Sequence, residues 1–351
     1  MTNSLSTEQR AEQWQMLAFH ARSFRWAAAF LRPGHRERVA ALYAFCRAVD
    51  DLADSEWVTD ESRRDLDQIC DALDAELEGR DAWPPNYLWF RGLCVESGID
   101  FRVVRELMAG MKSDLATVRM QSDRDLLRYC YRAAGTVGLM MCSVFGVRDP
   151  RAQRHAIDLG IAMQLTNICR DVMEDAESAR VYLPADRLTV YGVESNDLVR
   201  GSVDSDGVSL VVRELIEMSE CYYRSGDSGM TYLPRRARLA VLIASRLYRG
   251  IGRRLRAKQD CNPFIGRVVV PWYAKLRLVA AATASWVRLS WRSRRSRGPN
   301  GPNQLHSHLE GLPYTASAKP RKTPTLPPPR SGGKPPSAEV NHVGHAVGHP
   351  H

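Results

Sequence analysis

The residues best suited to chemistry in this sequence form two clusters of acidic and polar side chains, each spaced so that a helix would gather them on one face. The first cluster consists of Tyr43, Arg47, Asp50 and Asp54. The second consists of Gln164, Asn167, Asp171 and Asp175. At about 100° of rotation per residue, each set falls within a narrow arc of a helix surface. Both clusters are therefore predicted to present their carboxylates in one direction.

These two faces carry the hard oxygen ligands that Mg²⁺ prefers. Mg²⁺ is held by one or two carboxylates and completes its octahedron with water and substrate phosphate oxygens. The alternative is a solvated helix surface, but neither face alternates acids with lysines. Like charges four residues apart also destabilise an isolated helix by a few tenths of a kcal/mol. The spacing thus favours two opposed faces that hold several Mg²⁺ ions and a diphosphate between them.

Three charged residues in these segments are open to roles other than metal binding. Asp51 and Glu174 point about 100° away from the faces, so we expect them to act as supporting or solvent-exposed groups. Arg47 lies among acids, where it could serve as a structural counter-ion. It could equally bind a phosphate oxygen through its guanidinium group.

The elements that must position these residues are predicted to be helices throughout. Apolar residues recur with a 3.6-residue period, and convincing strand runs with hairpin turns are absent. The segments with this period are Phe24–Phe45, Ser62–Leu77, Phe101–Leu115, Asp123–Phe145, Ala152–Val172, Val208–Tyr223, Ala237–Arg256 and Val270–Leu289. The fold class is therefore all-α, and a single helical bundle around a central cavity is the expected host of the site.

The last sixty residues differ in composition from the rest of the chain. They contain nine Lys and Arg against two Glu, a net +7, which leaves only +2 of the total +9 for residues 1–291. They are also rich in Pro, Gly and His, a composition that buries too little apolar surface to fold. We therefore expect a catalytic domain over 1–291 and a disordered basic tail over 292–351, and the positive charge does not point to nucleic acid.

The sequence predicts a cytoplasmic protein. Its N-terminus has no basic segment followed by an apolar stretch, and its longest uncharged run, Ala133–Val147, is too short to span a bilayer. The eight cysteines are scattered without a CxxC pair, so buried reduced thiols are favoured over structural zinc.

Five ordered sequence blocks resemble the squalene/phytoene synthase family of head-to-head prenyl synthases, and the similarity runs from about His20 to Lys275. The blocks are Ala41–Asp51 (ALYAFCRAVDD), Gly110–Leu115 (GMKSDL), Tyr129–Gly138 (YCYRAAGTVG), Gln164–Asp171 (QLTNICRD) and Arg180–Pro184 (RVYLP). A single DxxxD motif is weak by itself, whereas five blocks at suitable intervals are specific. The stretch Gly229–Pro234 is in addition similar to the GxxYLP of bacterial phytoene synthases.

The resemblance implies an isoprenoid synthase fold and assigns roles to residues at matching positions. The metal ligands would be Asp50, Asp54, Asn167, Asp171 and Asp175, binding Mg²⁺, for which Mn²⁺ could substitute. The substrate-binding residues would be His20, Arg22, Ser23, Phe24, Tyr43, Arg47, Tyr129, Gln164, Arg170 and Tyr248. Catalysis would rest on the four aspartates with Arg47 and Tyr43. For Tyr248 the alternative is a tyrosine that only packs between helices.

The family's reaction joins two identical prenyl diphosphates through a cyclopropylcarbinyl diphosphate. The allylic cation must be kept from water, so we expect a sealed apolar cavity with Phe24, Tyr129, Leu139, Met140 and Met141 in its wall. For the two methionines, core packing is favoured over a place in the wall. Gly135 and Gly138 would permit close helix contact.

The features that distinguish members of the family favour the C20 substrate and phytoene as product. Ala27, Ala28 and Ala29 would leave a deep pocket. No dinucleotide fingerprint is visible, but squalene synthases lack an ordinary one too, so the Gly229–Pro234 stretch is the better indication that NADPH is not needed. The alternatives are an enzyme that makes dehydrosqualene, presqualene diphosphate or squalene from C15 substrate, and, more remotely, a non-catalytic helical module that binds membrane or nucleic acid. The basic residues after Trp291 (Arg292, Arg294, Arg295 and Arg297) would favour contact with the inner membrane face, and a tail that only increases solubility is the equal alternative.

Overall fold

The fold follows from the helical periodicity of the sequence. In a computed structural model, the described residues are 29–54, 60–203, 205–291 and 304–315. The chain divides into two units, Met1–Ala318 and Lys319–His351, and every described residue belongs to the first.

The described residues form an all-α structure, as the sequence predicts. Its α-helices are α3 (Pro33–Asp54), α4 (Asp60–Leu77), α5 (Leu88–Ser97), α6 (Phe101–Ser113), α7 (Asp123–Cys130), α8 (Thr136–Val144), α9 (Pro150–Arg170), α10 (Val172–Glu177), α11 (Ala185–Val190), α12 (Ser195–Arg200), α13 (Ser205–Gly229), α14 (Arg235–Gln259) and α15 (Trp272–Trp291). The shorter turns are η1 (Pro85–Tyr87), η2 (Tyr131–Gly135), η3 (Met230–Tyr232), η4 (Pro263–Ile265) and η5 (Gln304–Leu309). Extended pairing within these residues is limited to one isolated bridge, between Arg119 and Val181.

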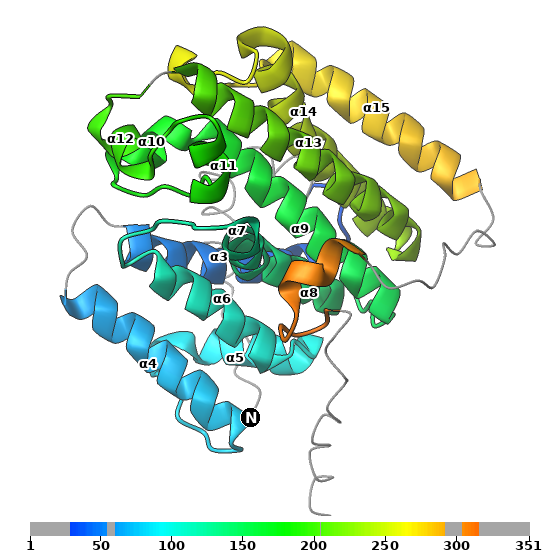
Figure 1. Ribbon diagram of the computed structural model, residues 1–351. Coiled ribbons are helices and arrows are strands. Elements are labelled where there is room, and N and C mark those ends of the chain that lie inside the picture. The colour runs from blue at the N-terminus through cyan, green and yellow to red at the C-terminus, as the bar shows by residue number, and fades with distance from the viewer. Residues whose placement is uncertain (1–28, 55–59, 204, 292–303, 316–351) are drawn as a thin grey trace, which may run out of the picture. The chain divides into compact units, whose positions relative to one another are not determined.

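Helix α9 is the central element that other helices pack against. It begins at Pro150, where Asp149 caps the first turn by accepting from the Arg151 backbone N–H. α9 contacts α13 and α14 as well as η2 and α8, and Figure 1 shows it running between these groups. At Gly138 and Gly160 the backbones approach so closely that a Cβ on either would lie 2.3 Å from a carbonyl oxygen of the facing segment. The close helix contact expected at Gly138 is thus confirmed.

The segment from Asp123 to Phe145, predicted as one helix, is divided in the structure. Ser122 and Asp125 form a capping box that starts α7, and the helix then widens into the π-helical turn η2 before α8 continues. A π-helical turn shifts the register of the helix, but the residues around it are mostly apolar or small, so the sequence pattern alone does not reveal the shift.

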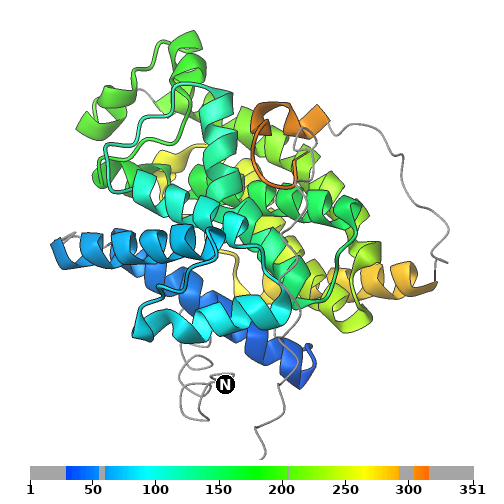
Figure 2. The same cartoon turned by 90° about the horizontal axis from the view of Figure 1, so that it is seen from below.

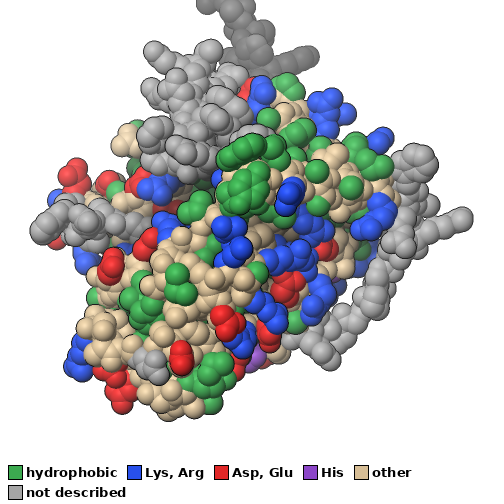
Figure 3. Space-filling view, turned by 90° about the horizontal axis from the view of Figure 1, so that it is seen from above, with side chains coloured by type: hydrophobic (Ala, Val, Ile, Leu, Met, Phe, Trp, Pro, Cys, Tyr) green, Lys and Arg blue, Asp and Glu red, His purple; other side chains and the backbone are tan. Residues whose placement is uncertain are grey.

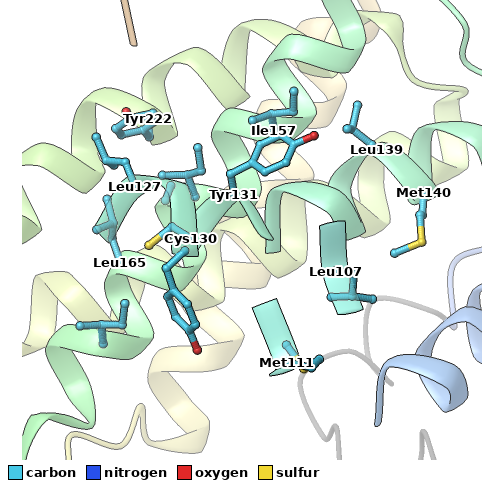
Figure 4. Packing of buried hydrophobic residues seen from close by; sticks show 14 of the residues in the cluster. Leu107, Met111, Leu127, Cys130, Tyr131, Leu139, Met140, Ile157, Leu165 and Tyr222 are labelled. Atoms are coloured by element: carbon cyan, nitrogen blue, oxygen red, sulfur yellow. The ribbon is translucent and has the colours of Figure 1, made fainter. Parts of the chain in front are cut away.

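The core is continuous across the helices that surround α9. Figure 4 shows Tyr131, Leu139 and Ile157 gathered between them, and all three are buried. Leu139 and Met140 were expected in a cavity wall; they belong instead to this core, whereas Met141 does line an apolar cavity beside α9. Core packing is the role that the sequence favours for both methionines, and it is confirmed for Met140, whereas Met141 lines the cavity.

Part of the predicted disordered tail is folded. Residues 304–315 form η5 and a following turn that pack against the body, with Leu309 and Leu312 buried (Figure 2, orange). Two tyrosine hydroxyls of the body donate to this segment: Tyr222 to the Leu305 carbonyl at 2.9 Å and Tyr131 to the Pro313 carbonyl at 2.7 Å. The expectation of disorder from residue 292 is therefore wrong for this stretch, because its leucines bury enough apolar surface to hold it.

The cysteines agree with the expectation of reduced thiols. All eight are free, and five of them are buried. Burial raises the pKa of the thiols of Cys94, Cys130 and Cys169, which keeps them protonated. No helix among the described residues is long and apolar enough to span a membrane.

Candidate active site

Helix α3 carries the first acidic cluster. Pro33 starts the helix, and Tyr43, Arg47 and Asp50 follow on its C-terminal half, each partly buried. Asp54 ends the helix, and its side chain lies outside the described residues, as do His20, Arg22, Ser23 and Phe24. Asp51, predicted to point off this face, forms an ion pair with Arg47. Arg47 therefore does act as a counter-ion, but it pairs with Asp51, which lies off the acidic face, and not with a residue of that face.

The second acidic cluster does not lie on one continuous helix, contrary to the prediction. α9 ends at Arg170, Asp171 adopts φ −106° and ψ 16°, and α10 starts at Val172. The backbone N–H groups of Asp171 and Asp175 still donate to the carbonyls four residues earlier, so the interruption is a local kink. Arg170 and Arg267 both pair with the Asp171 carboxylate, the latter at 3.2 Å, and these ion pairs hold it at the kink.

Side chains from three segments bring the two clusters together. Tyr43 on α3 lies close enough to Tyr248 on α14 for the two to interact electrostatically, and Tyr248 interacts in turn with Arg170 and Asp171. Burial raises the pKa of both tyrosine hydroxyls, so both are protonated donors at neutral pH. From the other side, the Arg180 guanidinium donates to the Ala53 carbonyl at 3.4 Å. The ends of α3 and α9 therefore share one region of the molecule.

Two buried polar atoms in this region lack a hydrogen-bond partner among the described residues: Nε of Arg47 and Oδ1 of Asn167. Leaving such a group unpaired costs about 1–3 kcal/mol, so its presence calls for an explanation. A guanidinium N–H can only donate and would suit an anion, whereas an amide oxygen can only accept and would suit a cation. The pair thus matches an anion and a metal ion bound side by side.

Arginine side chains neutralise the acidic groups at the kink. Besides its contact with Asp171, Arg267 pairs with Glu174 at 3.0 Å. Among the described residues, no group of three or more His, Cys, Asp and Glu side chains lies close enough together to hold a metal ion. The Asp54 side chain is not described, so it does not enter this comparison. The donors Asp50, Asn167, Asp171 and Asp175 are all oxygen ligands, and with the unpaired Asn167 oxygen they fit a hard divalent cation. The assignment of these residues as metal ligands stays a prediction.

An apolar cavity of about 250 Å³ begins beside these residues. Its polar lining at this end comes from Gln164, Asn167 and Tyr248. The rest of the wall is mostly small and aliphatic, including Val137, Gly138, Met141, Leu159, Met163, Val241 and Ala244. A cavity with one polar end and an apolar body suits a molecule with a charged head and a hydrocarbon chain.

Tyr129 is placed differently from the expectation that it lines the cavity. Its hydroxyl donates to Asp114 at 2.9 Å, Tyr182 donates to the other oxygen of the same carboxylate at 2.9 Å, and the two rings lie 4.7 Å apart. Burial raises the pKa of both hydroxyls. Tyr129 is not among the cavity-lining residues, so a role in substrate contact stays a prediction.

Four residues of this region, Asp114, Arg180, Tyr182 and Arg267, had no role in the predictions from sequence. The first three stand inside the blocks GMKSDL and RVYLP, so those blocks were the available signal. Arg267 lies in the loop after η4, where no periodicity or motif marks it.

Comparisons with known proteins agree with this geometry. The model of the squalene/phytoene synthase family matches residues 17–274. A phytoene synthase of Pseudescherichia vulneris is 35% identical over 69% of this chain and 81% of its own, and a 15-cis-phytoene synthase of a Paracoccus species is 34% identical over 80% and 90%. The crystal structure of a dehydrosqualene synthase with a ligand is similar with a TM-score of 0.69 and 28% identity, covering 80% of this chain and 96% of that one. The chain therefore belongs to the squalene/phytoene synthase family.

Proposed function

We propose that this protein is a phytoene synthase, which joins two C20 prenyl diphosphates head to head. Each of its two steps, formation of the cyclopropylcarbinyl diphosphate and its rearrangement to phytoene, releases one diphosphate and one proton. The observation that carries the proposal is the apolar cavity whose polar end is formed by Gln164 and Asn167 of the second cluster and by Tyr248, which interacts with Tyr43 of the first cluster. The relatives named as phytoene synthases, 31–36% identical over most of the chain, support the same product.

The residues at the polar end would hold Mg²⁺ through Asp50, Asp54, Asn167, Asp171 and Asp175. The ions would neutralise the charge of the departing diphosphate. Arg47 and Arg170 would bind diphosphate oxygens, and for Arg47 the unpaired Nε–H supplies the donor. Tyr248 would donate a hydrogen bond to the same head group. The aliphatic wall would exclude water from the allylic cation, and the proposed reaction needs no NADPH.

The main rival within the family is an enzyme that uses C15 substrate, because the similar crystal structure is a dehydrosqualene synthase. Of the three alanines that favour the longer chain, Ala27 and Ala28 lie outside the described residues, whereas Ala29 is exposed and is not among the residues that line the cavity. Incubation of the purified full chain with Mg²⁺ and either C15 or C20 diphosphate, with and without NADPH, separates the rivals. We expect phytoene from C20 without NADPH. Turnover of neither substrate would refute the proposal, and a C30 hydrocarbon as the main product would favour the rival.

We also propose that the protein contacts the inner face of the membrane through α15 and the loop before it. This surface exposes Val269, Trp272, Tyr273 and Leu276, with Trp272 at 74% exposure. The exposed Arg277 and Arg288 lie on the same helix, and Figure 3 shows apolar and basic side chains side by side on the face seen from above. Apolar side chains flanked by cations suit an anionic bilayer, in which a hydrocarbon product would dissolve.

Vesicle sedimentation tests this surface. Trp272→Ala combined with Leu276→Ser should reduce recovery on phosphatidylglycerol vesicles several-fold. Val190→Ser is the matched control, since Val190 is 75% exposed but lies on α11. Equal recovery of all three proteins, or equal binding to neutral vesicles, would contradict the proposed contact.

A further inference from the structure

Four hydrogen-bonded polar side chains reach the cavity at His155, on the side away from Asn167. His155 Nδ1 lies 2.9 Å from Ser225 Oγ, Ser225 Oγ donates to Asp158 Oδ2, and His306 Nε2 lies 2.8 Å from Asp158 Oδ1. The side chains of Asp158 and His306 are fully buried. The chain thus joins α9, α13 and the C-terminal segment 304–315 in one network.

The direction of the hydrogen bonds follows from the carboxylate. Asp158 accepts at both oxygens, so the Ser225 hydroxyl and His306 Nε2–H are the donors. The Ser225 oxygen can then accept from His155 Nδ1–H. Burial lowers the pKa of His155, which agrees with a neutral ring carrying its proton on Nδ1. The orientation of the His155 ring is therefore fixed by partners that reach back to the C-terminal segment.

His155 is the polar side chain at the far end of the cavity lining. The other polar residues of the lining, Gln164, Asn167 and Tyr248, are at the end beside the acidic clusters. His155 and Asn167 lie twelve positions apart on α9, and at 1.5 Å per residue this corresponds to about 18 Å. A hydrocarbon chain whose head group lies at Asn167 would therefore extend towards His155.

Two neighbouring segments, α13 and η3, pack against His155 and limit where its ring can lie. The α13 backbone passes so near that a Cβ at Gly229 would lie 2.4 Å from the His155 Cβ. The Tyr232 ring in η3 lies with its centre 6.2 Å from that of His155. With Ser225 on the same helix as Gly229, the imidazole has little room to leave the end of the cavity.

We propose that His155 limits the length of the prenyl chain that the cavity accepts, and that Ser225, Asp158 and His306 are positioning residues that hold it there. This inference rests on the proposed function, because it takes a prenyl diphosphate to be the occupant of the cavity. It assigns segment 304–315 a part in substrate selection, since that segment supplies His306.

The test is the ratio of kcat/KM for a C25 prenyl diphosphate to that for the C20 diphosphate, measured from initial diphosphate release with Mg²⁺. Both substrates meet the same fraction of folded enzyme, so the ratio does not change when a variant is merely less stable. In His155→Ala the ratio should rise at least tenfold. In Ser225→Ala and His306→Ala, where the ring keeps its size but loses its support, we expect a rise of about threefold.

Two further variants sharpen the positioning role. His306→Gln retains an N–H donor that can reach Asp158, so its ratio should return towards that of the wild type. His308→Ala removes an exposed histidine of the same segment and should leave the ratio unchanged. If His155→Ala fails to fold by circular dichroism, His155→Asn, which shortens the side chain but can still bond to Ser225, takes its place.

The outcomes separate this inference from the proposed function. A wild type that makes phytoene while the His155 variants keep the C25-to-C20 ratio would overturn the inference and leave the function intact. A wild type that turns over neither C15 nor C20 diphosphate would overturn both. An unchanged ratio in His306→Ala with a raised ratio in His155→Ala would overturn the positioning role of the C-terminal segment.

Discussion

The two ends of the cavity are both built from polar side chains, but they differ in whether those side chains satisfy one another. At the acidic end, Arg47 Nε and Asn167 Oδ1 are buried without a hydrogen-bond partner among the described residues. At the far end, each of His155, Ser225, Asp158 and His306 is hydrogen-bonded to the next. Among the buried polar atoms of these four side chains, as far as the structure describes them, only Nδ1 of His306 has no partner. The first pattern suits groups that await a ligand, and the second suits groups that fix a shape.

This difference predicts that substitutions at the acidic end will reduce activity more than stability. Substitutions at the far end, and in the C-terminal segment that supports it, should do the reverse.

The largest effect is expected from Asp171→Asn. The change keeps the shape of the side chain but removes the charge that would bind Mg²⁺, so kcat should fall about 1,000-fold. Glu174→Gln is the matched control, because Glu174 pairs with the same Arg267 but is predicted to lie off the ligand face. Phytoene formation measured by chromatography, with circular dichroism to confirm folding, decides the matter. Comparable activity of the two variants would remove Asp171 from the metal site.

Removal of the C-terminal segment should produce the largest loss of stability. A chain that ends after Asn303 loses the burial of Leu309 and Leu312 and leaves the Tyr131 and Tyr222 hydroxyls without their carbonyl partners. We expect the free energy of unfolding to fall by about 3–5 kcal/mol. A chain that ends after Ala318 keeps the segment and should match the full protein in urea denaturation. Equal midpoints for both truncations would show that the segment does not stabilise the body.

A pair of substitutions compares the two ends directly. Asp158→Ala leaves Ser225 and His306 without their acceptor and should lower the free energy of unfolding by about 2–4 kcal/mol. Asn167→Leu removes an unpaired buried oxygen at similar volume, so stability should be unchanged or rise by up to about 1 kcal/mol. The same Asn167 variant should lose at least tenfold in activity. A large loss of stability in Asn167→Leu would show that its oxygen has a structural partner.

The smallest effect concerns pH. Burial lowers the pKa of His155, with Arg154 and His306 acting in the same direction and Asp158 and Asp149 opposing. In the unfolded chain the pKa of His155 is near 6.5. Below that pH the unfolded state therefore binds more protons at His155 than the folded state does. Stability should therefore fall as the pH drops from about 6.5 towards the folded pKa. His155→Gln should lack this part of the fall in urea denaturation at several pH values, and an identical slope would contradict it.

Features that depend on residues close together in the sequence were predictable, whereas features that depend on residues far apart in the sequence were not. Helices such as α9 and α14 were predictable because their burial follows a local 3.6-residue period. The kink at Asp171 was not, because Arg267, one of the residues that fix it, lies 96 positions further along the chain. Local spacing cannot reveal such a partner.

The fold of segment 304–315 was also not predicted from sequence, because it too depends on residues that are distant in the chain. Leu305, Leu309 and Leu312 stand at offsets 0, 4 and 7, which is a helical pattern, but the surrounding Pro, Gly and His dominate the composition. The partner that makes the segment stable, the surface of α7, α9 and α13, is distant in sequence. In the acidic clusters, by contrast, the residue types alone pointed to diphosphate chemistry.

A competition assay tests the proposed function most directly. The purified full chain is given equal concentrations of C15 and C20 prenyl diphosphate with Mg²⁺ and no NADPH, and the carbon number of the hydrocarbons is determined by mass spectrometry. A phytoene synthase is expected to make C40 phytoene as the dominant product. A predominance of C30 product, or no hydrocarbon at all, would contradict it.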